Sequence, residues 1–422
     1  MKKRKISLIV VAIAILTMGI GGCSKEKTVV VGTNVQDSKN EGVNISEETI
    51  NLKMDDNLLY TPKYFDGDKI YGTFGPNAGR AVKNGTQDYP IAGLFKKNLY
   101  TVESDGSIKE TDREPVFYDE RIRGSKGVDI DVVNNMIGEG INYDIYHYDD
   151  KAGEKRKIGT AYSSENKDNI GGREVCTQII EGQSEFAYTL LNEREHEWGV
   201  RLESNVMGKN KLLNLQILGV NNGEKYEYKG TDVSAIGDIV YSEITDKFYA
   251  LDVKGKLYNI ELKDNEAKFS EVDNIDLKGL DVDDIYERSV SVNSNGEILI
   301  FNKVYKGQVL TIKYNPETKK TTYINKDNDE STRILQYFTD GNKVVFSKTS
   351  SDNNHEIYVG ELKDDYIKVY TKLDIPSSEG EMLGYTSAIM SDDGKKMLVS
   401  QYICKSENGV SYRYVYKMLT FN

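Results

Sequence analysis

The stretch that decides the fold is Ser391-Asp392-Asp393-Gly394-Lys395-Lys396-Met397-Leu398-Val399-Ser400, a polar turn followed at once by an apolar run. Turn residues reverse the chain, and a short apolar run between turns is typical of a strand buried on both faces. The same order of residues recurs along the chain. The copies are Asp66–Tyr71, Gly182–Tyr188, Asp246–Leu251, Asn295–Phe301, Asp340–Phe346 and Asp393–Val399.

These copies define a repeat. From Gly182 onward the steps are about 64, 50, 45 and 53 residues, and the long interval after Gly67 leaves room for one further unit near Val128–Tyr148. A second pair of strands follows the copy, for example Val309–Tyr314 and Lys320–Ile324. Four short strands in each unit of about fifty residues are typical of propeller blades. The sequence therefore predicts an all-β fold, a β-propeller of seven four-stranded blades.

A propeller must also close. Each blade has an apolar face that only a neighbouring blade can cover, so the array has to form a ring. The last unit offers Lys396–Gln401 and Tyr412–Phe421. We expect Thr49–Met54 to supply its outer strand, because N- and C-terminal strands that share a blade remove two exposed edges. Two stacked β domains are the alternative, which would need a linker within residues 55–422, and none is visible.

The N-terminal segment predicts a location. Met1–Lys5 is basic, and the apolar stretch Ile6–Met18 is too short to span a bilayer comfortably. The tetrapeptide Ile20-Gly21-Gly22-Cys23 that follows resembles the lipobox of bacterial lipoproteins. The resemblance implies that residues 1–22 are a signal peptide and that Cys23 carries acyl chains such as palmitate. A plain signal peptide or an uncleaved anchor is the alternative.

Two acyl chains anchor a protein stably to a membrane. We therefore expect a lipid anchor on the extracytoplasmic face of the cell membrane. Residues 23–48 hold the lipidated Cys and a flexible tether rich in Ser, Lys, Glu and Asn, and residues 49–422 form the propeller domain. The two remaining cysteines, Cys176 and Cys404, are far apart in sequence and are interpreted as unpaired thiols, with a disulfide between them as the alternative.

A second resemblance concerns the blades. Ser391–Ser400 resembles the S-P-D-G-K-K element of TolB-like (WD40-like) propellers, with Asp392 in place of the Pro, and Phe338–Ser347 is a weaker copy. The resemblance implies the propeller architecture. It leaves function open, because propellers serve as enzymes, scaffolds and binding modules.

The composition disfavours nucleic-acid binding. The chain has 55 Lys+Arg against 67 Asp+Glu, a net charge of −12 that repels phosphate backbones. Catalytic and metal motifs are incomplete: His196-Glu197-Trp198-Gly199-Val200 lacks the second His of a zinc helix, and Asn325–Glu330 lacks the turn Gly of a calcium loop. The sequence thus predicts no catalytic residue, metal or cofactor, although paired acids for glycoside cleavage have a spatial separation that no sequence reveals.

Aromatic residues and one long loop supply the candidate contact surface. Several aromatic residues crowd one strand, and the stretch between Phe74 and Leu94 is the clearest departure from the repeat. Long loops on rigid scaffolds often carry function. The candidate residues are Tyr143, Tyr146, His147 and Tyr148 on the strand, and Arg80 and Tyr89 in the loop. By contrast, the alternating Tyr412, Tyr414 and Tyr416 are interpreted as packing between blades.

These observations favour a lipid-anchored cell-envelope protein that binds a protein, small-molecule or glycan ligand through one propeller face, and not an enzyme. The alternative is an extracytoplasmic polysaccharide hydrolase or lyase with acids on blade loops. The enzyme hypothesis predicts convergent carboxylates or a His in a central funnel. The binding hypothesis predicts an apolar or tyrosine-rich patch on one face.

Overall fold

The fold is described from a computed structural model of the chain. It describes residues 29–31, 44–53, 58–76, 99–103, 106–112, 121–123, 129–137, 140–149, 154–164, 173–180, 186–193, 211–219, 223–228, 230, 232–253, 255–275, 280–281, 290–305, 308–324, 331–349, 355–376, 378, 380–406 and 410–422. These residues form an all-β structure with one short 3-10 turn, η2 (Asp340–Asn342). Among them there is no helix with the length and apolar character that crossing a membrane requires.

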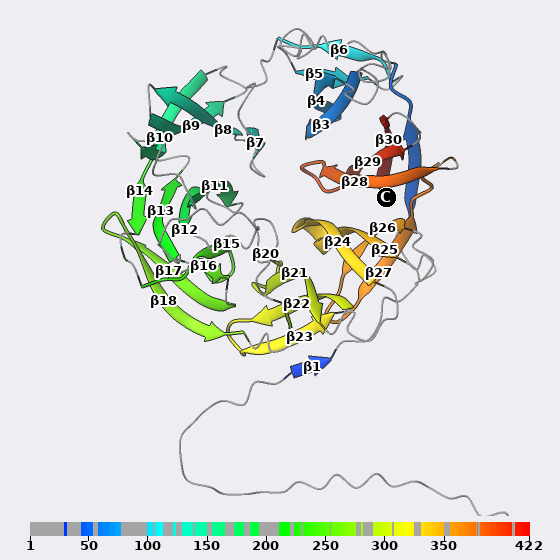
Figure 1. Cartoon of the computed structure of the whole chain (residues 1–422). Coiled ribbons are helices and arrows are strands. Elements are labelled where there is room, and N and C mark those ends of the chain that lie inside the picture. The colour runs from blue at the N-terminus through cyan, green and yellow to red at the C-terminus, as the bar shows by residue number, and fades with distance from the viewer. Residues whose placement is uncertain are drawn as a thin grey trace, which may run out of the picture.

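The strands form antiparallel sheets arranged in a ring (Figure 1), which is the architecture of a β-propeller. In the first half of the chain one sheet contains β3 (Leu58–Asp66), β4 (Lys69–Pro76), β5 (Tyr100–Val102) and β6 (Ile108–Glu110). The next contains β7 (Arg121–Arg123), β8 (Asp129–Ile137), β9 (Gly140–Asp149) and β10 (Glu154–Ser164). This second sheet occupies the place of the predicted unit near Val128–Tyr148.

An eight-stranded sheet follows. One half contains β11 (Arg173–Ile180), β12 (Phe186–Glu193), β13 (Lys211–Gly219) and β14 (Lys225–Tyr228). The other contains β15 (Ile236–Ser242), β16 (Lys247–Asp252), β17 (Lys256–Lys263) and β18 (Glu266–Asn274). Each half is antiparallel, and the two meet at a single parallel pair, Glu227 and Glu266. The pairing therefore joins two four-stranded halves at their outer strands.

The C-terminal part of the chain supplies three more sheets. The first contains β19 (Leu280–Asp281), β20 (Val290–Val292), β21 (Ile298–Tyr305), β22 (Gln308–Asn315) and β23 (Lys320–Ile324), with β1 (Val29–Val31) paired parallel to β23. The second contains β24 (Ser331–Phe338), β25 (Lys343–Thr349), β26 (His355–Leu362) and β27 (Ile367–Lys372). The third contains β28 (Glu381–Met390), β29 (Lys396–Ser406), β30 (Val410–Phe421) and β2 (Ile45–Ile50).

The apolar runs of the repeat lie where the sequence predicts. Val344, Val345 and Phe346 on β25 are fully buried, as are Ile298, Leu299 and Ile300 on β21. Alternate side chains of such a strand point to opposite faces of the sheet, and here neighbouring sheets cover both faces. Val344 and Phe346 pack toward Leu299 on one side, whereas Val345 packs toward Met397 on the other. The core is thus a series of layers between sheets.

The ring is closed by N- and C-terminal strands, as predicted, although the closing strand begins earlier. Ile45–Ile50 pairs antiparallel with β30, from Ile45 opposite Phe421 to Ile50 opposite Tyr416. The predicted range Thr49–Met54 is wrong because the chain leaves β30 after Ile50. Lys53 N–H then donates to the Gly106 carbonyl of the next sheet (2.8 Å). Gly106 has φ of 78° and no room for a Cβ beside the Asn51 carbonyl, so the crossing requires glycine there.

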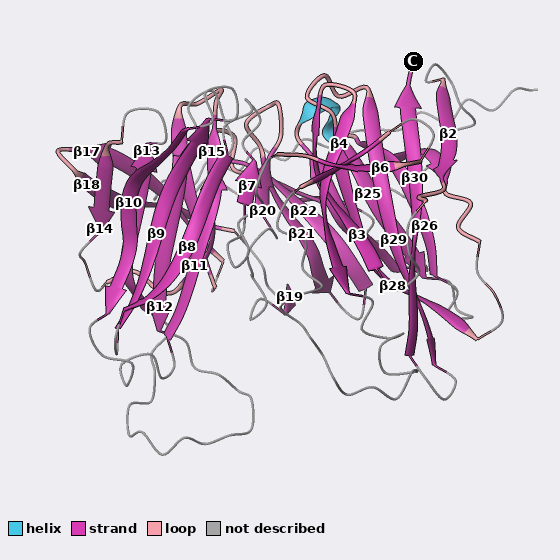
Figure 2. Cartoon of the chain, turned by 90° about the horizontal axis from the view of Figure 1, so that it is seen from above, coloured by secondary structure: helices cyan, strands magenta, loops and turns pink. Residues whose placement is uncertain are grey.

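The other difference concerns the segment predicted as a flexible tether. Val29–Val31 pairs with Thr321–Tyr323 of β23, and Ile45–Glu48 belongs to β2, so seven residues of this segment are paired in sheets. The turns at the two ends of the strands form the two faces of the ring (Figure 2), and η2 lies on one of them.

Candidate functional site

The candidate site is an apolar patch on β28, a strand at the inner edge of its sheet (Figure 1). Three large apolar side chains of the described residues are exposed: Ile244, Met382 and Tyr385. Two of these, Met382 at 56% and Tyr385 at 69%, lie on β28. A soluble protein usually buries such side chains, and tyrosine is enriched where proteins bind partners. We call Met382, Tyr385 and the half-buried Tyr402 the tyrosine patch.

A bulge in β28 exposes Tyr385. The strand pairs regularly with β29 up to Leu383 opposite Ile403 and again from Thr386 opposite Gln401, so Gly384 and Tyr385 both face Tyr402. A Cβ on Gly384 would lie 2.7 Å from Cδ1 of Tyr402, which means that the tyrosine ring rests on the glycine. A bulge re-aims a side chain out of the regular alternation. Gly384 therefore permits both the bulge and the position of the Tyr402 ring.

The buried side chain of Gln401 fixes this bulge. Its Nε2 donates to the carbonyl oxygens of Gly384 (3.2 Å) and Tyr402 (2.8 Å), and its Oε1 accepts a bond from the hydroxyl of Thr386 (2.5 Å). At the start of β28, Arg413 donates to both carboxylate oxygens of Glu381 (3.0 and 2.8 Å). Bidentate contacts of this kind restrict the relative orientation of the two side chains. The patch is consequently held on a rigid strand before any ligand arrives.

Rings continue the patch toward the neighbouring sheet. Tyr402 lies opposite Tyr414 across the β29–β30 pair, with ring centroids 5.3 Å apart, and Tyr414 lies 5.8 Å from Tyr416. Tyr416 donates its hydroxyl to the Tyr60 carbonyl of the β3–β6 sheet (2.5 Å). Burial raises the pKa of Tyr414, and the nearby Tyr385 adds to the rise. The interpretation of Tyr414 and Tyr416 as packing is confirmed, while the side chain of Tyr412 lies outside the described residues.

Polar contacts also join neighbouring four-stranded units of the ring. Asn192 on β12 donates to the Ile236 carbonyl (2.9 Å) and accepts from its N–H (3.1 Å). Asn302 on β21 makes the same pair of bonds with Ile334 on β24 (2.6 and 2.8 Å). Each amide thus forms a two-bond link between two four-stranded units.

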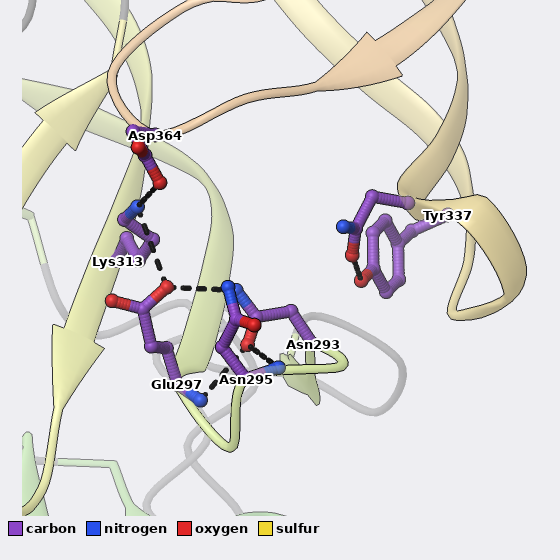
Figure 3. Close-up of polar contacts among 7 residues, drawn as sticks. Asn293, Asn295, Glu297, Lys313, Tyr337 and Asp364 are labelled. Atoms are coloured by element: carbon purple, nitrogen blue, oxygen red, sulfur yellow. Dashed lines mark hydrogen bonds and ion pairs between the residues drawn. The ribbon is translucent and has the colours of Figure 1, made fainter.

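A charged network lies between the β20–β23 and β24–β27 sheets (Figure 3). Nζ of Lys313 on β22 is 3.3 Å from Glu297 and 3.3 Å from Asp364, a residue of the β26–β27 turn. Asn293 donates to Glu297 (2.9 Å), and its Oδ1 accepts from the backbone N–H groups of Asn295 and Glu297. This network holds a turn of one sheet against a turn of the next.

The side chains that the sequence analysis singled out as candidate contacts lie outside the described residues, so these assignments stay predictions. Tyr143, Tyr146, His147 and Tyr148 lie on β9, whose backbone alone is described, and their side chains lie outside the described part. Cys23, Arg80 and Tyr89 are likewise outside it. Cys404 is a free thiol. Within the described ranges no group of three or more His, Cys, Asp or Glu side chains is placed to hold a metal ion.

Sequence reasoning missed Met382 and Tyr385. A signal existed in Glu381-Met382-Leu383-Gly384-Tyr385, because glycine inside a strand often marks a bulge and the next side chain is then re-aimed.

Comparisons with known proteins found matches among solved structures alone. No protein-family model matches the chain, nor does any curated protein. Among solved structures, an oligogalacturonate lyase in complex with manganese has a TM-score of 0.49 at 12% identity, covering 90% of this chain and 96% of that chain.

Two further solved structures are similar at the same low level. An oligogalacturonate lyase from Vibrio parahaemolyticus has a TM-score of 0.47 at 12% identity, covering 91% of this chain and 98% of its own. The Dos1 propeller has a TM-score of 0.38 at 10% identity, covering 83% and 74%. Similarity at this level supports no conclusion about activity.

Proposed function

We propose that this chain is a lipid-anchored binding protein of the cell envelope whose tyrosine patch engages a protein or small ligand. The observation that carries the proposal is the exposure of Met382 and Tyr385 on one strand whose bulge is fixed by Gln401. A preorganised aromatic side chain pays little entropy on binding, and tyrosine offers both an apolar ring and a hydroxyl.

The finer parts of this proposal rest on the sequence. The N-terminal pattern supports a signal peptide over residues 1–22 and lipidation at Cys23, which would place the propeller on the extracytoplasmic face. The resemblance of Ser391–Ser400 to TolB-like elements supports a propeller of that type. We count seven blades by treating the two halves of the eight-stranded sheet as separate blades, since a single pair joins them.

The patch is tested by paired variants of the full chain. Tyr385→Ser and Met382→Ser together remove the two exposed apolar side chains, and Ile244→Ser removes a side chain of similar exposure (62%) from the β15–β16 turn. Partners are captured from solubilised envelope after crosslinking and quantified by mass spectrometry. We expect one set of partners to fall at least tenfold with the double variant and to persist with Ile244→Ser. Equal capture by all three proteins would refute the assignment of the patch.

The anchor is tested separately. Cys23→Ser should move the chain from the membrane fraction to the soluble fraction. An acylated N-terminal peptide should be obtained from the wild-type chain and not from the Cys23→Ser variant. The hydrolase or lyase alternative makes a different prediction, namely new reducing or unsaturated ends when purified protein is incubated with polysaccharide. Such products, abolished by substitution of loop acids, would replace the binding hypothesis by the enzyme hypothesis.

A further inference from the structure

The N-terminal strand β1 joins the ring at one defined corner. Val29 pairs with Thr321, the second residue of β23, and the two strands run parallel. The chain that precedes Val29 therefore reaches the ring beside the turn between β22 and β23, which begins after Asn315 and ends at Lys320. The position of this turn decides which side of the ring lies nearest to the N-terminus.

The β22–β23 turn belongs to one face of the ring. In a four-stranded antiparallel sheet the first and third turns lie at the same end, so the β20–β21 turn is at that face as well. It adjoins the β15–β16 turn, since a Cβ on Gly296 would be 3.6 Å from Cβ of Ile244, and Lys313 links it to the β26–β27 turn. The first turn of that next sheet is η2, which lies against Gly394 of the β28–β29 turn. We call these turns the entry face, and η2 marks it in Figure 2.

The tyrosine patch lies toward the opposite face. β28 runs from Glu381 to Met390 and ends beside the β28–β29 turn of the entry face. Met382 is eight residues before Met390, which corresponds to about 26 Å at 3.3 Å per residue, and Tyr385 is about 17 Å before it. The exposed side chains of the patch are thus well removed from the entry face.

The covalent chain limits how far the entry face can lie from a lipid anchor. Val29 follows Cys23 by six residues. A fully extended chain spans at most about 3.6 Å per residue, so roughly 20 Å is the greatest separation of these two residues, whatever the conformation between them. Acyl chains on Cys23 would therefore hold the β22–β23 turn within about 20 Å of the bilayer surface as long as β1 stays paired.

The surface chemistry of this corner suits a membrane surface. The β15–β16 and β22–β23 turns line one hollow, through Lys247 and Glu317 among others. Ile244, in the first of these turns, is 62% exposed, and the boundary between headgroups and acyl chains is more favourable for an apolar side chain than water is. The exposed charges are of both signs, with Glu243 and Glu317 beside Lys247 and Lys320, so charge gives no strong attraction or repulsion.

We propose that the entry face is the surface that this protein turns toward lipid headgroups, with β1 fixing that orientation. The inference rests on the proposed anchor at Cys23 and adds an orientation to the proposed function. The tyrosine patch then opens on the side away from the bilayer. Its partner is consequently one that reaches the ring from beyond the membrane surface, and not a lipid or a membrane-embedded segment.

The test is energy transfer from a donor dye on the acylated full chain to acceptor dyes on the headgroups of phosphatidylcholine vesicles. The donor is attached to Glu317→Cys on the entry face or to Ser378→Cys, each in a chain that also carries Cys176→Ser and Cys404→Ser. Ser378 N–H donates to Glu381 (2.7 Å) at the start of β28, so it marks the opposite face. We expect transfer from position 317 to be at least twofold more efficient than from position 378. Anionic phosphatidylglycerol vesicles should give the same ratio, because the tether and not charge sets the orientation.

A change in β1 tests what holds the orientation. Replacing Val29–Val31 by Gly-Pro-Gly removes the β1 pairing, so the first paired strand is β2 and the free tether extends from Cys23 to residue 44. A flexible tether of that length has an rms reach of about 25 Å, so the ring turns more freely and the excess transfer from position 317 should fall by at least half. The same replacement at Asn34–Gln36, outside both strands, is the matched control and should leave the ratio unchanged.

The outcomes separate this inference from the anchor itself. Vesicle-bound chain with equal transfer from the two positions, or with higher transfer from position 378, would overturn the inference and leave the anchor intact. An undiminished ratio after removal of β1 would also overturn it. A wild-type chain that does not bind vesicles would refute the anchor at Cys23 and this inference with it.

Discussion

The network around Lys313 allows a quantitative prediction about stability. Lys313 is 7% exposed and lies between two carboxylates of very different environment, since Glu297 is 15% exposed and Asp364 is 94% exposed. Breaking a buried ion pair costs about 3–5 kcal/mol because one charge stays buried without compensation, whereas an exposed pair contributes about 0.2–1 kcal/mol. Although both carboxylates are 3.3 Å from the same Nζ, we expect unequal effects.

The expected values follow from these exposures. Lys313→Met keeps the length of the stem and removes the charge, so it should cost about 3 kcal/mol, at the lower limit because Asn293 still donates to Glu297. Asp364→Asn should change stability by no more than about 0.5 kcal/mol. The double variant Glu297→Gln with Lys313→Met leaves no buried charge, and we expect it to cost about 1 kcal/mol, less than the single Lys313→Met.

The assay is urea unfolding followed by circular dichroism. Free energies of unfolding are compared among variants whose slope of free energy against urea concentration equals that of the wild-type chain. Added salt should weaken the effect of Asp364 and leave that of Lys313 nearly constant, because exposed charges are screened and buried ones are not. The reasoning would be refuted if Asp364→Asn matched Lys313→Met, or if the double variant were as unstable as the sum of its two single variants.

Three further predictions concern the sheets and their contacts. Asn302→Gly keeps a residue suited to the φ of 57° but removes both hydrogen bonds to Ile334, so it should lower the free energy of unfolding in urea by about 2–3 kcal/mol. The control is Asn265→Gly, at φ of 62° in an exposed hairpin turn, which should change that free energy by less than about 0.5 kcal/mol. Burial and a hydrogen bond to Asp232 raise the pKa of Tyr228 to about 12. Because the folded chain holds this proton more tightly than the unfolded chain, the contribution of Tyr228 to stability is complete below pH of about 10 and is lost as pH rises toward 12. Tyr228→Phe should therefore flatten that part of a curve of unfolding free energy against pH. A chain that starts at residue 52 lacks β2, so it should unfold at a lower urea concentration and aggregate through the exposed edge of β30. A synthetic peptide of residues 44–51 should restore the unfolding midpoint. Failure of the peptide to do so would argue that β2 does not close the ring.

Those features of the fold whose cause lies in neighbouring residues of the sequence could be predicted. Val344–Phe346 and its copies are apolar because both faces of each strand are covered, and that pattern is visible in the sequence. The closing strand was placed too late since Ser46, Glu47, Glu48 and Thr49 are all exposed, so no apolar alternation fixes its register.

The candidate site was harder to predict because its causes are distant in sequence. Exposure of Tyr385 depends on a bulge that Gln401 stabilises from the next strand, and the pairing of Lys313 with Asp364 joins residues of two sheets. By contrast, the aromatic cluster on β9 was conspicuous in the sequence and remains a prediction.

The two strands that precede the propeller have a mechanical consequence. The chain reaches the ring through β1 on one sheet and then β2 on another, each held by backbone bonds along an outer edge. Tension applied at the N-terminus would load β1 first and β2 only after β1 had peeled away. The three-residue pairing of β1 should therefore separate before the six-residue pairing of β2, which closes the ring, is strained.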